Sequence, residues 1–111
     1  MSLATNPLIG GTPVDGLEGW FLSEWFGDYY TFNTDPPWLF HAEHEFIFRD
    51  PMSTSASLYF YDDAMRTWWW TNLIFYPYVY RFSDGVWLWY QEGSNDPRWF
   101  LNLDSGSWEP L

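Results

Sequence analysis

The chain has 111 residues, of which 25% are Phe, Trp or Tyr, and it contains no cysteine. That length suits one domain with one core, and the missing cysteine excludes disulfides, thiolate metal sites and a cysteine nucleophile. Fifteen acidic residues against four arginines and no lysine give a formal net charge of −11. Because nucleic acids and anionic membranes both attract basic surfaces, we expect neither as a partner.

The first part of the chain, residues 1–19, is rich in Gly and Pro and poor in large apolar residues. This composition predicts a flexible N-terminal arm or linker. It shows no signal-peptide pattern, and no apolar run in the chain approaches the roughly 20 residues that span a bilayer, so we expect no membrane insertion. Residues 20–111 are predicted to form an aromatic-rich β-hairpin repeat domain.

From Trp20 onwards, three large apolar residues followed by one polar residue occur five times, at 20–23, 38–41, 59–62, 78–81 and 99–102. The starts lie 18, 21, 19 and 21 residues apart. Short aromatic runs interrupted by Gly and Pro are typical of strands, and a near-constant period indicates repeated supersecondary units. The sequence therefore predicts a single small all-β domain, an antiparallel meander of four to five β-hairpin repeats of about 20 residues.

The unit at 78–90 illustrates the predicted hairpin: a strand over 78–82, a turn at 83–85 and a return strand over 86–90. Gly85 supplies the positive φ that such a turn requires. The last unit repeats this order, whereas the turns at 41–45 and 62–66 lack glycine and the first unit, 20–30, fits least well. Prolines between units should mark strand starts or edges, at Pro36, Pro37, Pro51, Pro77 and Pro97. Residues 52–57 are predicted to be a mobile surface loop.

Alternation along the strands divides each triplet between two faces of the sheet. The middle residues of the four clearest units are purely apolar and should point into the core: Leu39, Phe60, Val79 and Phe100. Most flanking rings carry a polar group and suit a half-exposed face. Aromatic rows bind sugars by stacking and cations by cation–π attraction. The candidate ligand-binding residues are Trp38, Tyr59, Tyr61, Tyr78, Tyr80 and Trp99.

Other polar groups give weaker signals. His41 and His44 have a spacing that can share a metal ion, but no third ligand is placed by sequence, so an exposed polar turn is favoured. Acids recur in successive turns, at Asp62, Asp63, Asp84 and Asp104, and turn formation explains them better than calcium binding. Arg49, Arg66, Arg81 and Arg98 are expected to bridge acids or stack on rings. We predict no catalytic residues, no metal and no cofactor.

Three stretches carry a resemblance to known proteins: 37–44, 76–80, and 97–100 together with 106–108. They resemble a group of uncharacterised aromatic-rich domains at the C-termini of large exported or surface bacterial proteins, over roughly residues 20–109. In that group a Gly-Trp pair often follows the turn, and Glu45-Phe46 and Arg66-Thr67 stand in its place here. The chain is more loosely similar to choline-binding and cell-wall-binding hairpin repeats.

Together these patterns predict a non-catalytic surface or terminal module that binds a glycan or cell-envelope component through exposed aromatic residues. The alternative is a structural or assembly module whose aromatic face mediates contact with a partner domain or a second copy. The resemblance implies an extracellular or cell-surface location within a larger exported protein, and a cytoplasmic location stays open.

Overall fold

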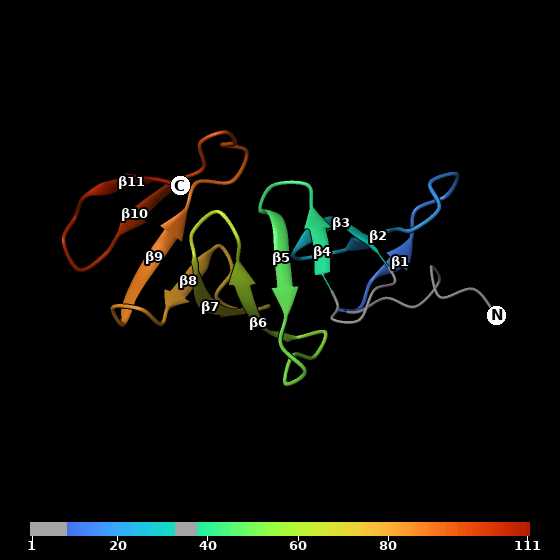
Figure 1. Ribbon diagram of the computed structural model, residues 1–111, viewed down its shortest axis with the longest axis horizontal. Coiled ribbons are helices and arrows are strands. Elements are labelled where there is room, and N and C mark those ends of the chain that lie inside the picture. The colour runs from blue at the N-terminus through green and yellow to red at the C-terminus, as the bar shows by residue number, and fades with distance from the viewer. Residues whose placement is uncertain (1–8, 33–37) are drawn as a thin grey trace.

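A computed structural model describes residues 9–32 and 38–111. It contains one antiparallel sheet whose strands follow each other in sequence order, which confirms the predicted all-β meander. The hairpins succeed one another along the long axis of a 48 × 25 × 24 Å body, from β1 and β2 to β10 and β11 (Figure 1). The strands are β1 (Thr12–Pro13), β2 (Trp20–Ser23), β3 (Gly27–Thr31), β4 (Trp38–His41), β5 (Glu45–Arg49), β6 (Ser57–Asp62), β7 (Thr67–Asn72), β8 (Tyr78–Arg81), β9 (Val86–Tyr90), β10 (Trp99–Asn102) and β11 (Trp108–Pro110).

The N-terminal segment differs from the predicted arm where the structure describes it. Ile9 is buried in the core, and β1 pairs with β2 through the register Thr12 to Leu22. The hydroxyl of Tyr29 also donates a hydrogen bond to the carbonyl of Gly10. Ile9, Gly10 and β1 are therefore held against the first hairpin, while residues 15–18 form an exposed turn and residues 1–8 lie outside the described residues.

The inner face of the sheet carries the core, and the prediction for its middle residues is confirmed. Leu39, Phe60, Val79 and Phe100 are fully buried, and Phe21 shows that the first unit, which fitted least by sequence, obeys the same rule. The return strands add inward residues at matching places: Tyr29, Ile47, Trp69 and Leu88. Of the linker prolines, Pro77 and Pro97 stand just before β8 and β10, whereas Pro36 and Pro37 lie outside the described residues.

The polar residue that closes each triplet is also buried, and it organises the turn that follows. In four units its side chain accepts a hydrogen bond from the backbone N–H three residues later: Ser23 from Phe26 (3.2 Å), His41 from His44 (3.1 Å), Asp62 from Met65 (2.9 Å) and Asn102 from Ser105 (3.1 Å). In the remaining unit Arg81 forms an ion pair with Asp84, again three residues on (2.7 Å). In those four units the closing residue therefore satisfies a turn donor from inside the core, whereas Arg81 holds its turn through the Asp84 side chain.

Each of these turns ends on a residue with positive φ, four positions after the closing residue. Glycine occupies three of the positions, at Gly27, Gly85 and Gly106, whereas Glu45 (φ 61°) and Arg66 (φ 62°) occupy the other two. The two turns without glycine thus keep the geometry of the others, although a side chain in this region is strained.

The loop at 52–57 is tied to the sheet rather than free. Ser53 is buried, and its hydroxyl accepts a hydrogen bond from the backbone N–H of Tyr59 (2.9 Å). The same hydroxyl lies 3.1 Å from the Tyr59 carbonyl. The interpretation of this segment as a mobile loop therefore does not hold around Ser53.

The sheet coils so that the first two turns pack beneath later hairpins. Phe26, in the first turn, stacks on Phe60 of β6 at a ring distance of 5.5 Å and reaches Trp69 of β7 at 6.3 Å. Glu43, in the second turn, reaches Tyr90 of β9. This coiling encloses one face of a single sheet, so the core needs no second layer. Among the described residues, no helix is long and apolar enough to cross a membrane.

Candidate functional site

The outer face of the sheet is covered by four rows of side chains, each crossing four successive strands. Paired residues define the rows, and fifteen of the sixteen members are aromatic. The first row is Trp20–Tyr30–Phe40–Phe46, the second Trp38–Phe48–Tyr61–Trp68, the third Tyr59–Trp70–Tyr80–Trp87 and the fourth Tyr78–Trp89–Leu101–Trp108. We call them the outer rows.

Neighbouring rings in the outer rows pack mainly edge to face. Trp38 and Phe48 lie 5.4 Å apart at 74°, Tyr80 and Trp87 5.4 Å apart at 65°, and Trp89 and Trp108 6.0 Å apart at 75°. Pairs of this geometry contribute about 0.5–1.5 kcal/mol each beyond their buried area. Most rings in the rows are half-buried, so the rows stabilise the sheet and still present ring surface to solvent.

The fourth row is the most open of the four. Tyr78 at one end is 42% exposed and Trp108 at the other is 48% exposed. Trp99, which is 38% exposed, lies two residues before Leu101 on β10 and pairs with Pro110 of β11. The row therefore forms a strip of accessible Trp and Tyr side chains across β8 to β11.

The six ligand-binding residues predicted from sequence do not meet at one place. Trp38 and Tyr61 belong to the second row, Tyr59 and Tyr80 to the third, and Tyr78 to the fourth, while Trp99 lies beside the fourth. Sequence reasoning missed Trp89 and Trp108, which complete the fourth row. For Trp89 the sequence did hold a signal: alternation along the return strand, because a residue next to inward Leu88 must face outward.

A pocket of about 380 Å³ opens beside the first and second rows. It is lined by three aromatic residues, Phe32, Trp38 and Phe46, and by Asp63. Phe32 and Phe46 lie nearly parallel, with ring centroids 6.0 Å apart and planes inclined by 22°. Both phenylalanines are exposed.

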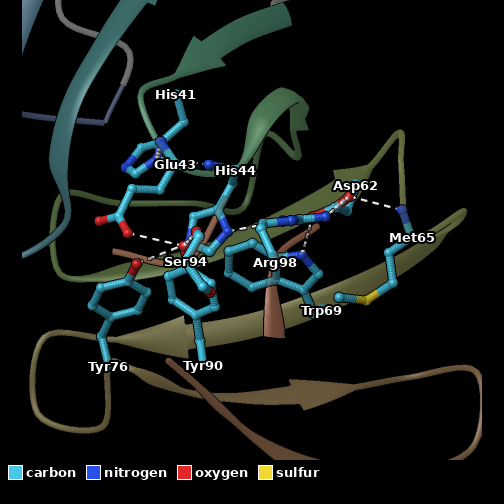
Figure 2. Close-up of polar contacts among 10 residues, drawn as sticks. All are labelled: His41, Glu43, His44, Asp62, Met65, Trp69, Tyr76, Tyr90, Ser94 and Arg98. Carbon is cyan, nitrogen blue, oxygen red and sulfur yellow. Dashed lines mark hydrogen bonds and ion pairs between the residues drawn. The ribbon is translucent and has the colours of Figure 1, made fainter. Parts of the chain in front are cut away.

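A buried polar cluster lies on the opposite, inner face, and Figure 2 shows its residues. The Asp62 carboxylate receives two hydrogen bonds from the Arg98 guanidinium, at 2.8 and 2.9 Å, and one from the Trp69 indole N–H, at 3.0 Å. Arg98 also lies 5.3 Å from the centre of the Phe100 ring. The expectation that arginines bridge acids or stack on rings is confirmed for Arg98, and for Arg81 between Asp84 and Glu109.

Both histidines belong to this cluster, which corrects the prediction of an exposed polar turn at 41–45. His41 and His44 are buried. Arg98 donates to Nδ1 of His44 at 2.9 Å, so Nε2 of His44 carries the hydrogen and faces the Tyr76 hydroxyl at 2.8 Å. Nδ1 of His41 accepts from two backbone N–H groups, so its Nε2 donates to the carbonyl of Phe26 at 2.7 Å.

Burial keeps both imidazoles neutral. It lowers the pKa of His41 to about 4, against an opposing effect of its hydrogen bond to the Phe26 carbonyl. Burial also lowers the pKa of His44 well below 6.5, and the neighbouring His41 and Arg98 act in the same direction. With both nitrogens of each ring engaged, these side chains stabilise the packing of the second turn against Phe26, Tyr76 and Arg98.

Glu43 closes the other end of the cluster. Its carboxylate accepts hydrogen bonds from the backbone N–H of Gly93 at 2.6 Å and from the Tyr90 hydroxyl at 2.9 Å. Burial raises the pKa of Tyr90, and the Glu43 carboxylate raises it further. Glu43 thus links the second turn to the loop after β9. Within the described ranges, no three His, Asp or Glu side chains are grouped so that they could hold a metal ion.

Comparison of this chain with protein-family models, with curated proteins and with solved structures found no match. The two faces of the sheet differ in chemistry: the inner face holds a buried polar cluster, and the outer face carries accessible aromatic rows.

Proposed function

We propose that this chain is a non-catalytic binding module that takes an uncharged glycan, or another neutral cell-envelope component, on its outer aromatic face at a cell surface. The observation that carries the proposal is the fourth row, where Tyr78 and Trp108 expose 42% and 48% of their surface on one strip. The C–H groups on the face of a sugar ring pack favourably against the electron-rich faces of Trp and Tyr.

Charge selects the kind of glycan. The net charge of −11 repels anionic polysaccharides, and this repulsion acts over about 10 Å at moderate ionic strength. A neutral polymer meets no such penalty. The ligand class supported by the surface is therefore uncharged and ring-bearing.

The test is titration of the purified chain with soluble neutral glucans, mannans and chitin fragments, followed by isothermal calorimetry. Trp108→Ala should weaken binding about tenfold, as expected for an aromatic residue that anchors a ligand. Leu17→Ala is the control, because Leu17 is 55% exposed in the turn between β1 and β2, at the other end of the sheet from the fourth row. Failure of every neutral glycan to bind, or equal loss in both variants, would contradict the proposal.

A second candidate function is assembly with another copy, and it is favoured by the position of the fourth row at the edge strand β11. Trp108 ends the row on that edge, where a further strand could continue it. Pro110 lacks an N–H and limits the hydrogen bonds that such a strand could form. Sedimentation at rising concentration tests this: a dimer that Trp108→Ala abolishes supports assembly, and a monomer throughout rejects it.

A further inference from the structure

The pocket between the first and second outer rows combines aromatic side chains with an acidic one. It is lined by three aromatic residues, Phe32, Trp38 and Phe46, and by one acid, Asp63. The rings come from the segment after β3, from β4 and from β5, while Asp63 comes from the turn between β6 and β7. Pairing of successive strands brings these elements together, because β3, β4, β5 and β6 are neighbours in the sheet.

Asp63 is exposed and is held at the pocket by its backbone. Its backbone N–H donates a hydrogen bond to the carbonyl of Phe46 at 3.2 Å, which fixes the residue beside that ring. The ion pairs among the described residues use other acids, namely Asp62, Asp84 and Glu109. An exposed carboxylate next to aromatic faces attracts a cation from two sides, through its own charge and through the ring quadrupoles.

We propose that this pocket binds an arginine side chain presented by a basic partner protein. A guanidinium is planar, so it can lie against the Trp38 or Phe46 ring while its N–H groups meet the two oxygens of Asp63. It is also weakly hydrated, which lowers the cost of leaving water for a site as open as this one. The net charge of −11 attracts a basic partner over a longer range.

Other cations fit these features less well. A lysine ammonium is compact and strongly hydrated, and it presents no plane to stack on a ring. A quaternary ammonium has no N–H and so makes no hydrogen bond to Asp63. The pocket lies on the part of the sheet formed by β3 to β7, whereas the proposed glycan strip crosses β8 to β11, so the two sites are independent.

The experiment uses the full chain, isotope-labelled, and a short capped peptide with one arginine in a Gly/Ser background. The expected result is a saturable shift of the Trp38 indole and Phe46 amide signals. The same peptide with citrulline, which keeps the shape and loses the charge, should bind at least about tenfold more weakly, and a lysine peptide at least about threefold more weakly.

Two matched variants locate the contact. Asp63→Asn should weaken the arginine peptide about tenfold, because it removes the charge and keeps the side-chain shape. Asp104→Asn removes an exposed acid of the turn between β10 and β11 and should leave binding unchanged. Unchanged circular dichroism and melting temperature of both variants serve as the folding check.

The assignment is overturned if no saturable binding occurs or if the citrulline peptide binds as well as the arginine peptide. Equal binding of the lysine peptide overturns the choice of guanidinium. Equal weakening by Asp63→Asn and Asp104→Asn also overturns the site, because it would show attraction by net charge alone.

Discussion

The Asp62–Arg98 pair places two opposite charges where almost no water reaches, with side chains 0% and 4% exposed. Removing one partner leaves a buried charge without compensation, which typically costs about 3–5 kcal/mol. We therefore expect Arg98→Met to lower the free energy of unfolding by about that amount in urea titrations, since Met fills much of the volume without the charge.

Arg66→Met is the control for that substitution, because Arg66 is an exposed arginine in the turn before β7. It should change the free energy of unfolding by no more than about 0.5 kcal/mol. A cost below about 1 kcal/mol for Arg98→Met would show that water or another group compensates Asp62.

At this scale the sequence predicted the apolar core better than the polar one. The period of two that places Leu39 inward also places His41 inward, and the same holds for Phe60 and Asp62. Polar side chains are mostly exposed in folded proteins, and this general tendency favoured an exposed turn at 41–45. Burial is tolerated because Arg98 pairs with Asp62 and backbone groups bond to His41, and these partners could not be identified from spacing alone.

The hairpin turns are the elements whose geometry is most tightly repeated, and their last residue has positive φ in all five. Glu45 and Arg66 bear the strain of a side chain in this region, which costs about 1–2 kcal/mol, while glycine there loses about 0.5–1 kcal/mol more entropy on folding. Glu45→Gly and Arg66→Gly should each raise the free energy of unfolding by about 0.5–1 kcal/mol.

Gly106→Ala is the reciprocal experiment. A Cβ at Gly106 meets nothing within 4 Å, so only the φ of 75° opposes the substitution. Alanine there should lower the free energy of unfolding by about 1 kcal/mol. Stabilisation by Gly106→Ala, or destabilisation by Glu45→Gly, would mean that something other than backbone strain governs these turns.

Strands and turns were largely predictable from sequence because both depend on local patterns. The return strand expected at 86–90 matches β9, and the turns at 41–45 and 62–66 have the expected positions despite their missing glycines. β1 was missed, since Thr12-Pro13 carries no alternation and forms a strand only by pairing with β2.

At the scale of the whole molecule, the coiling of the sheet decides what the repeats become. Contacts such as Phe26 with Phe60 and Glu43 with Tyr90 join units that are not neighbours in sequence. The twist that creates these contacts accumulates over many strands, so no local pattern reveals them. The same twist brings His44 to Arg98.

That enclosed core makes the whole molecule sensitive to acid, and His41 sets the pH range. Its pKa is about 4 in the folded chain and 6.5 when unfolded. Between these values the unfolded state binds a proton that the folded state does not, so the free energy of unfolding falls as pH falls. From pH 6.5 to pH 4, His41 alone should remove about 3 kcal/mol.

His41→Asn separates this contribution from the rest, because asparagine caps the equivalent turn at Asn102 without titrating. The variant should lose less stability than the wild type between pH 6.5 and pH 4, by about 3 kcal/mol in urea titrations. Two other effects remain in both proteins: neutralisation of acids relieves the repulsion within a chain of charge −11, and His44 continues to oppose protonation. Because His41 also lowers the pKa of His44, its removal reduces the His44 contribution in the same direction. An equal loss in wild type and variant would therefore show that His41 accepts a proton without disturbing the core.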